Sequence, residues 1–223
     1  MSEIFLDTET TGLSFKDGHK LVEIACIETK DLIPNGNVFH KLVNPERDVP
    51  EEAQKIHGFS TELLKTKESF NLIADNFINF IKDKKLIIHN APFDLSFLNY
   101  ELRLVRKNEI KKNQVIDTLE LARGKFIGSS NSLDALCKRF NIDLSRRKKH
   151  NALLDCELLR EVYINLIEAK EPKFSFLSEL NEVEKNIGKK NSAQYCKNII
   201  KPSAVEIEKH NDFLKKEIKK NYY

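Results

Sequence analysis

The sequence predicts an α/β fold with a mixed central β-sheet flanked by helices, followed by a C-terminal helical tail. The first sign is the order of the apolar segments, because strand-like runs come first and then alternate with helix-like runs up to about residue 170. The second is that the three earliest strands lie close together in the chain, which favours antiparallel pairing between neighbours. The third is size, since 223 residues are enough for one sizeable domain plus an appendage.

The first strand carries the strongest signal for chemistry. Ile4, Phe5 and Leu6 favour a buried strand, which runs directly into Asp7 and Glu9. Side chains two positions apart in a strand lie on the same face, so both carboxylates are expected at one spot. Like charges held together repel, and a hard divalent cation with oxygen ligands is the usual remedy. The alternative is an exposed acidic pair on an edge strand.

The other elements follow from turn residues and from strand-like or helical spacing. Gly12 is expected to allow a turn after the first strand. Residues 21–29 and 38–43 predict two strands that continue the antiparallel meander. Further strands are predicted at 86–88 and 115–118, and helices at 51–55, 61–65 with Ser60 as cap, 70–81, 92–105, from 119, 133–140, 152–168 and 203–219.

Composition narrows the function classes. The net charge of +3 is too small to indicate nucleic-acid binding by itself. The four cysteines have neither zinc-type spacing nor a disulfide framework, which points to a reducing cytoplasm. A signal peptide is not expected, because the first strand begins at residue 3, and no apolar run approaches the roughly 20 residues of a membrane span.

The chain is expected to divide into three parts. Residues 1–170 form the α/β domain, residues 171–201 a polar linker, and residues 202–223 an amphipathic helix. One face of that helix is apolar and has no obvious place in the first domain, so it either docks back or binds a groove on a partner. The residues of that face are Ala204, Ile207, Leu214 and Ile218.

Two more carboxylates stand where helices begin. Asp94 follows the strand at 86–88, and Asp155 lies one turn inside a helix, with His150 in the approach to that helix. A flexible approach would let the His150 ring reach the site that Asp155 faces. Each residue also has a plain alternative: a first-turn acid that complements the helix dipole, a solvated histidine beside lysines, or an exposed helix charge.

Taken together, the order D-x-E, D, H-x4-D resembles the DEDDh 3′→5′ exonucleases, which have an RNase H-like fold. The matching segments are FLDTETTG at 5–12, HNAPFD at 89–94 and HNALLD at 150–155. Within that superfamily the chain is most similar to the proofreading subunits of bacterial replicative DNA polymerases, a likeness to which IHG at 56–58 and the C-terminal extension add. The resemblance covers about residues 1–170 and implies an RNase H-like exonuclease fold there.

The resemblance implies phosphodiester hydrolysis with two divalent ions, Mg²⁺ or Mn²⁺, about 3.5–4 Å apart. Asp7, Glu9, Asp94 and Asp155 would hold the metal ions. His150 would take the proton from the attacking water. The implied substrate-binding residues are Asp7, Thr8, Glu9, Thr10, Gly12, Glu52, His57 and Asp155. Glu52 and His57 have plain alternatives as a helix cap and a turn histidine.

The resemblance also implies partners: a DNA 3′ end, and the polymerase catalytic subunit bound through the C-terminal tail. A clamp-binding peptide is not clear, because FSFL at 174–177 lacks a leading glutamine. The basic run RRKK at 146–149 is either a solvated face or a contact to phosphates. Asn90 is expected to fix the loop around Asp94.

Two rival functions remain. A DEDDh exoribonuclease that trims RNA 3′ ends would use the same catalytic residues, so those residues do not discriminate. A non-catalytic, polymerase-stabilising subunit would be expected to lack at least one carboxylate or the histidine, and this chain has all five.

Overall fold

A computed structural model describes residues 2–145, 147, 149–168 and 202–217. The chain divides into two units, Met1–Pro172 and Lys173–Tyr223, each of which is treated by itself below. The predicted linker at 171–201 and the FSFL segment lie outside the described residues, as do positions 218 and 219 of the predicted last helix.

The first unit is built on a five-stranded mixed sheet, which confirms the predicted fold class. The strand order is β3-β2-β1-β4-β5. β1 pairs antiparallel with β2, and β2 with β3, as the meander prediction required; β1–β4 and β4–β5 are parallel. The strands are β1 Ser2–Thr10, β2 Leu21–Lys30, β3 Ile33–Leu42, β4 Lys85–Ile88 and β5 Val115–Asp117.

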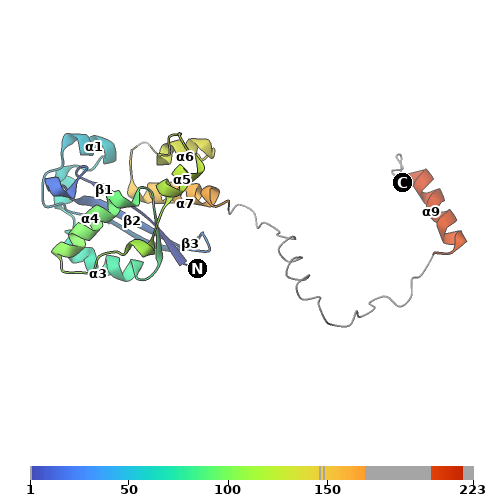
Figure 1. Ribbon diagram of the computed structural model, residues 1–223, viewed down its shortest axis with the longest axis horizontal. Coiled ribbons are helices and arrows are strands. Elements are labelled where there is room, and N and C mark those ends of the chain that lie inside the picture. Colours follow the sequence, from blue (N-terminus) through green and yellow to red (C-terminus); the bar gives the residue numbers. More distant parts are fainter. Residues whose placement is uncertain (1, 146, 148, 169–201, 218–223) are drawn as a thin grey trace. The chain divides into compact units, whose positions relative to one another are not determined.

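Helices cover both faces of this sheet (Figure 1), which is why Ile4, Phe5 and Leu6 of β1 are all buried although successive side chains point to opposite faces. Ile4 and Leu6 pack with α3 (Phe70–Ile81) and α4 (Ala91–Leu104) on one face. Phe5 packs with α7 (Ala152–Leu166) on the other. The odd-numbered side chains of β1 therefore point to the side of α7.

The β2–β3 hairpin is longer than the sequence indicated, because β3 begins at Ile33 rather than at residue 38. Asp31 and Leu32 both have positive φ, at 52° and 67°, so the two strands are joined by a two-residue turn of the kind that matches strand twist. Pro34 then sits in the strand, which is possible because β3 is the edge of the sheet.

The smaller elements lie where spacing predicted them. Ser60 caps its helix by accepting a hydrogen bond from the Leu63 N–H at 3.3 Å. The helices are α1 Glu51–His57, α2 Thr61–Lys65, α5 Thr118–Lys125 and α6 Leu133–Arg139, with short 3₁₀ turns at Phe15–Asp17 and Lys112–Gln114.

In the second unit the described element is α9 (Ala204–Glu217), within the predicted 203–219. Val205, Ile207 and Phe213 on this helix are exposed. In the part of the chain that the structure describes, none of the helices has the length and apolar character needed to cross a membrane.

Candidate active site

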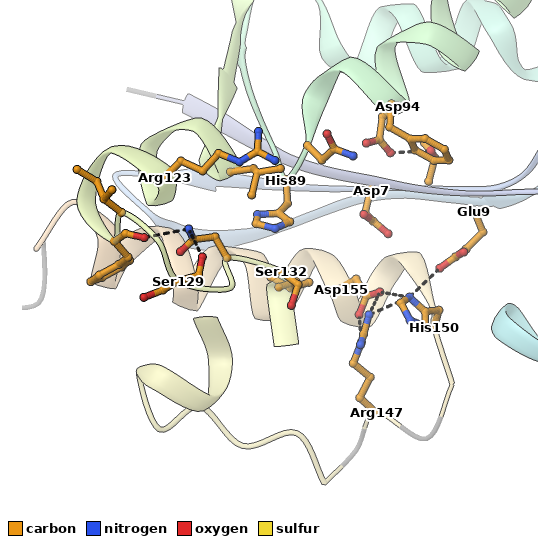
Figure 2. Close-up of a pocket in the computed structure, with 18 of the residues that line it drawn as sticks. Asp7, Glu9, His89, Asp94, Arg123, Ser129, Ser132, Arg147, His150 and Asp155 are labelled. Atoms are coloured by element: carbon orange, nitrogen blue, oxygen red, sulfur yellow. Dashed lines mark hydrogen bonds and ion pairs between the residues drawn. The ribbon is translucent and has the colours of Figure 1, made fainter. Parts of the chain in front are cut away.

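The carboxylates of β1 lie where the strand leaves the core. Asp7 and Glu9 share the odd-numbered face, so they point toward α7, which carries Asp155 in its first turn. Figure 2 shows Asp7, Glu9, Asp155 and His150 turned toward a common space. The predicted gathering of these four side chains is therefore present in the structure.

Asp94 reaches the same region from the other face of the sheet. It lies in the first turn of α4, and its carboxylate accepts a hydrogen bond from the Thr8 hydroxyl at 2.7 Å. Asn90 precedes that helix with a φ of 66° and donates its N–H to Asp117 Oδ1 at 3.0 Å. The backbone of Asn90 thus ties the start of α4 to β5, whereas the role expected of its side chain in fixing the loop around Asp94 stays a prediction.

The approach to α7 places the histidine. Asn151 is the N-cap and accepts from the Leu154 N–H at 3.1 Å, so His150 stands just outside the helix, as its spacing from Asp155 predicted. His150 Nδ1 lies 3.6 Å from Asp155 Oδ2 and 4.0 Å from Glu9 Oε1. With its side chain 49% exposed, the ring is accessible to a substrate.

Burial dominates the ionisation of the carboxylates on β1 and α4. It raises the pKa of Asp7 well above the usual range, and the charges of Asp94 and Asp155 add to this. Burial raises the pKa of Glu9 to about 8, against the opposing charge of His150. Burial likewise raises the pKa of Asp94 to about 7, although the Thr8 hydrogen bond acts in the opposite direction. Without added cations, the ionised forms of these three carboxyl groups are therefore energetically unfavourable.

Asp155 behaves in the opposite way. Burial acts to raise its pKa, but hydrogen bonds from His150 and Arg147 outweigh burial and hold the pKa below the usual range. In return, the hydrogen bond with Asp155 raises the pKa of His150, with burial opposing. The α7 side of the site therefore carries its own positive charge.

Most of that charge comes from Arg147. Its guanidinium grips both oxygens of Asp155, at 2.6 and 2.8 Å, and donates to Asp134 Oδ1 at 2.5 Å. A third contact joins Arg147 Nη2 to His150 Nδ1 at 2.9 Å. The side chain is only 9% exposed, so the alternative of a solvated face at 146–149 is wrong for this residue, while a contact to phosphates stays a prediction because Arg147 lines the cavity. Arg147 stands among other basic residues and outside any helix, so the sequence did not indicate that it pairs with Asp155.

Two cavities meet at the end of β1. The first, of about 850 Å³, is lined by the four carboxylates, His150 and Arg147, and extends to the loop between α5 and α6 at Ser129 and Ser132. The second, of about 540 Å³, is lined by most of the residues expected to bind substrate. Those residues are Thr8, Glu9, Thr10, Gly12, Glu52 and His57. Phe93, which sequence reasoning missed, lines both cavities.

His57 brings a spare hydrogen-bond donor to the second cavity. Its Nδ1 accepts from the Phe59 N–H at 3.0 Å, and burial lowers its pKa, so the neutral ring carries its proton on Nε2. That buried nitrogen has no hydrogen-bond partner among the described residues. A buried donor without a partner costs free energy, which an acceptor on a bound molecule would recover.

Gly12 is needed for a reason other than the expected turn. A Cβ there would lie 2.4–2.5 Å from the His19 ring, which is too close for any side chain. His19 is in turn held 3.1 Å from the Thr11 hydroxyl. The glycine therefore allows His19 to pack against the chain beside the second cavity.

The donor set suits divalent cations. Ligand atoms of Glu9, His150 and Asp155 lie within 4.8 Å of one another, and the carboxylates of Asp7 and Asp94 face the same cavity. Carboxylate oxygens are the ligands that hard divalent ions prefer. A cation would also relieve the repulsion that raises the pKa of Asp7.

Comparison with known proteins gives consistent results. A family model described as "Exonuclease" matches residues 4–163, which include all five site residues. DNA polymerase III subunit epsilon of Rickettsia conorii (strain ATCC VR-613 / Malish 7) is 46% identical over 228 residues, covering 100% of this chain and 99% of the relative. The protein of the same name from Escherichia coli (strain K12) is 44% identical over 169 residues, or 73% of this chain and 70% of the relative.

Solved structures share the fold. A structure described as "Exonuclease X in complex with 5′ overhanging duplex DNA" is 26% identical, with a TM-score of 0.59, over 75% of this chain and 92% of that one. An exonuclease I structure has a TM-score of 0.67 at 17% identity, over 77% and 42% of the two chains, a likeness that shows the fold alone.

Proposed function

This chain belongs to the exonuclease family, and we propose that it removes 5′-mononucleotides from DNA 3′ ends as the proofreading subunit of a replicative DNA polymerase. One observation carries the proposal: four carboxylates and a histidine line a single cavity at the end of β1. Relatives named DNA polymerase III subunit epsilon match the chain along its whole length, which supports the assignment to a polymerase.

Membership of the family implies divalent metal ions. We assign their binding to Asp7, Glu9, Asp94 and Asp155, with two ions of Mg²⁺ or Mn²⁺ per site. When bound, such ions stabilise the charge that develops on the attacking and leaving oxygens of a phosphodiester. Asp155 gives both of its oxygens to Arg147 in the structure, so it must share or release one of those bonds to act as a ligand.

His150 is assigned as the general base. Its half-exposed ring faces the cavity, and Asp155 beside Nδ1 stabilises the imidazolium that forms when the ring takes a proton from water. Arg147 donates toward the same Nδ1. A protonated ring cannot accept that hydrogen bond, so Arg147 must leave Nδ1 as the proton arrives.

The second cavity is assigned to the terminal nucleotide. Thr8, Thr10 and Gly12 would lie along it chiefly through their backbone, while Glu52 and His57 would contact the nucleotide with their side chains. The unpaired Nε2–H of His57 supports this assignment, because a nucleotide offers acceptors throughout its base and sugar. Asp7, Glu9 and Asp155 would face the phosphate at the junction of the two cavities.

The C-terminal tail is proposed to bind the polymerase catalytic subunit. The exposed apolar side chains of α9 support this, since such a face can fill a groove on another protein. We further propose that the protein acts in the cytoplasm, where a replicative polymerase has its template.

The deciding experiment compares a 3′-mismatched primer–template with a matched single-stranded RNA, each with Mg²⁺, with Mn²⁺ and with chelator. We expect release of 5′-mononucleotides mainly from the DNA 3′ end, with either metal and none with chelator. Faster trimming of RNA would overturn the DNA assignment while keeping the chemistry. Absence of hydrolysis with both metals would overturn the enzymatic assignment itself.

A further inference from the structure

A fifth carboxylate lies beside the site without lining either cavity. Glu23 of β2 is fully buried and stands directly opposite Glu9 in the register of the two antiparallel strands. It therefore shares the face of the sheet that carries Asp7 and Glu9. A buried carboxylate so close to other acids is costly unless its own hydrogen bonds compensate.

The hydrogen-bond partners of Glu23 do not line either cavity. One oxygen of Glu23 accepts the backbone N–H of Ala152, the first residue of α7, at 2.9 Å. The other accepts from the Asn151 side-chain amide at 3.2 Å and contacts His40 Nε2 of β3 at 2.7 Å. Glu23 thus connects two neighbouring strands to the beginning of one helix.

The place where Glu23 holds the helix matters for chemistry. Asn151 and Ala152 directly follow His150, and Asp155 lies one turn further along α7. An anion at a helix N-terminus also satisfies an N–H group that has no partner within the helix. From the other side, the His150 N–H donates to the Ile56 carbonyl of α1 at 3.2 Å. The segment that carries the histidine is therefore held at both ends.

We propose that Glu23, supported by His40, is a positioning residue for His150 and Asp155. Through Ala152 and Asn151 it sets the distance between the α7 residues and the β1 carboxylates that face them. This inference rests on the proposed exonuclease activity, and a displacement of about 1 Å can cost roughly 10²-fold in rate.

The test compares Glu23→Gln with Glu28→Gln in the full chain. Glu28 is a matched control, because it is a buried carboxylate of the same strand that binds Lys84 and Asn37 on the other face of the sheet. For Glu23→Gln we expect kcat for a single-stranded DNA oligonucleotide to fall by roughly 10- to 100-fold, with KM changed by less than about 3-fold. For Glu28→Gln we expect kcat within about 2-fold of the parent.

A second readout reports position directly. In chelator, the imidazole ¹⁵N resonances of His150 should shift in Glu23→Gln and stay in place in Glu28→Gln. Equal kcat for Glu23→Gln and the parent would overturn the inference, and so would equal losses in both variants, which would indicate general destabilisation. Absence of hydrolysis by the parent would instead count against the proposed function.

A milder variant covers the case in which Glu23→Gln does not fold. His40→Phe removes one partner of Glu23 on the side away from the cavity, and we expect a fall in kcat of roughly 3- to 10-fold at unchanged KM. A folded His40→Phe variant with the kcat of the parent, and with unshifted His150 resonances, would overturn the role of this network.

Discussion

The two halves of the site solve the same electrostatic problem in different ways. On β1 and α4, burial and mutual repulsion raise the pKa values of Asp7, Glu9 and Asp94. On α7, Asp155 is as buried as Asp94, and burial acts to raise its pKa, yet the neighbouring His150 and the hydrogen bonds from Arg147 hold that pKa low. The carboxylates on β1 and α4 have raised pKa values, whereas Asp155 on α7 is paired with a cation of the chain, Arg147.

The four carboxylates that we assign as metal ligands therefore stand in two different electrostatic environments. Three carboxylates are kept in an unfavourable state that added cations would relieve. The charge of the fourth, Asp155, is already compensated by Arg147. Five changes would break or sharpen the contrast, and they are given from the largest expected effect to the smallest.

The largest effect is expected from Asp7→Asn, on the half without its own cation. We expect activity with Mg²⁺ to fall by at least about 10³-fold, because Asp7 is assigned as a metal ligand and a bound metal ion supplies several kcal/mol of transition-state stabilisation. In chelator we expect the variant to be more stable than the parent by about 1 kcal/mol, since a repelling charge is gone. Hydrolysis rates and urea unfolding check both. Asp75→Asn, which alters an exposed pair with Lys107, should change neither.

Replacing His150 removes the proposed general base and leaves the four proposed metal ligands in place. We expect His150→Ala to lower kcat by about 10²- to 10⁴-fold while DNA binding, measured by fluorescence anisotropy with Ca²⁺, stays within about 3-fold of the parent. The reason is that the base acts on water rather than on DNA. Turnover close to that of the parent would refute the assignment.

Arg147→Gln should leave Asp155 without its arginine partner, in an environment closer to that of Asp7 and Asp94. Removing one partner of a buried ion pair leaves an uncompensated charge, so we expect a loss of about 3 kcal/mol in the free energy of unfolding in chelator. Saturating Mg²⁺ should reduce this loss, because a bound cation takes over the compensation. Arg103→Gln, at an exposed pair with Glu109, should cost less than about 1 kcal/mol. A loss that Mg²⁺ does not reduce would contradict the comparison.

The pH dependence of stability in chelator tests mainly the carboxylates on β1 and α4, and the raised pKa of His150 adds a change of the same sign. Glu9 and Asp94 have folded pKa values of about 8 and about 7, above the values of 4.5 and 3.8 that they have when unfolded. Stability from a raised pKa is present at low pH and lost as pH rises through the folded value. We therefore expect the free energy of unfolding to fall from pH 5 to pH 8, by up to roughly 6 kcal/mol if the two groups titrate independently and by less where they interact. Urea unfolding at each pH would show it, and with Mg²⁺ the fall should be smaller.

The smallest effect is expected from the tail. Both halves of the site lie within residues 2–168, so a chain that ends at Pro172 should degrade short oligonucleotides within about 2-fold of the full rate. The same truncation should abolish copurification with the polymerase catalytic subunit. A collapse of the oligonucleotide rate would mean that the second unit contributes to the catalytic domain.

Sequence reasoning predicted the strands, the mixed sheet and the placement of the five site residues, because each depends on local spacing. Asp7 and Glu9 share a face by strand alternation alone, and His150 precedes its helix because of its distance from Asp155. Ligand roles remain proposals that rest on these positions and on family membership. The roles of Arg147 and Glu23 were missed, because they depend on contacts that the spacing of residues in the sequence does not show.

Arg147 and Glu23 illustrate the gap. Arg147 looked like part of a charged surface run, and only the folding of α6 and α7 around it shows that it is buried. Glu23 was hidden among the apolar residues of β2, a strand buried on both faces. Its proposed role depends on α7, a helix that begins 129 positions later in the chain. The longer hairpin was missed because an edge strand tolerates Pro34.

The bond between Glu23 and Ala152 spans 129 positions, which has a consequence for the order of events during synthesis. Chains emerge N-terminus first, so the β1–β3 meander is available long before α7 leaves the ribosome. Until then the Glu23 carboxylate lacks its partners on α7, and His150 and Asp155 have not yet been synthesised. A prematurely ended chain therefore contains most of the sheet but no complete nuclease. The complete set of five site residues therefore exists only once α7, the last described helix of the first unit, has been made.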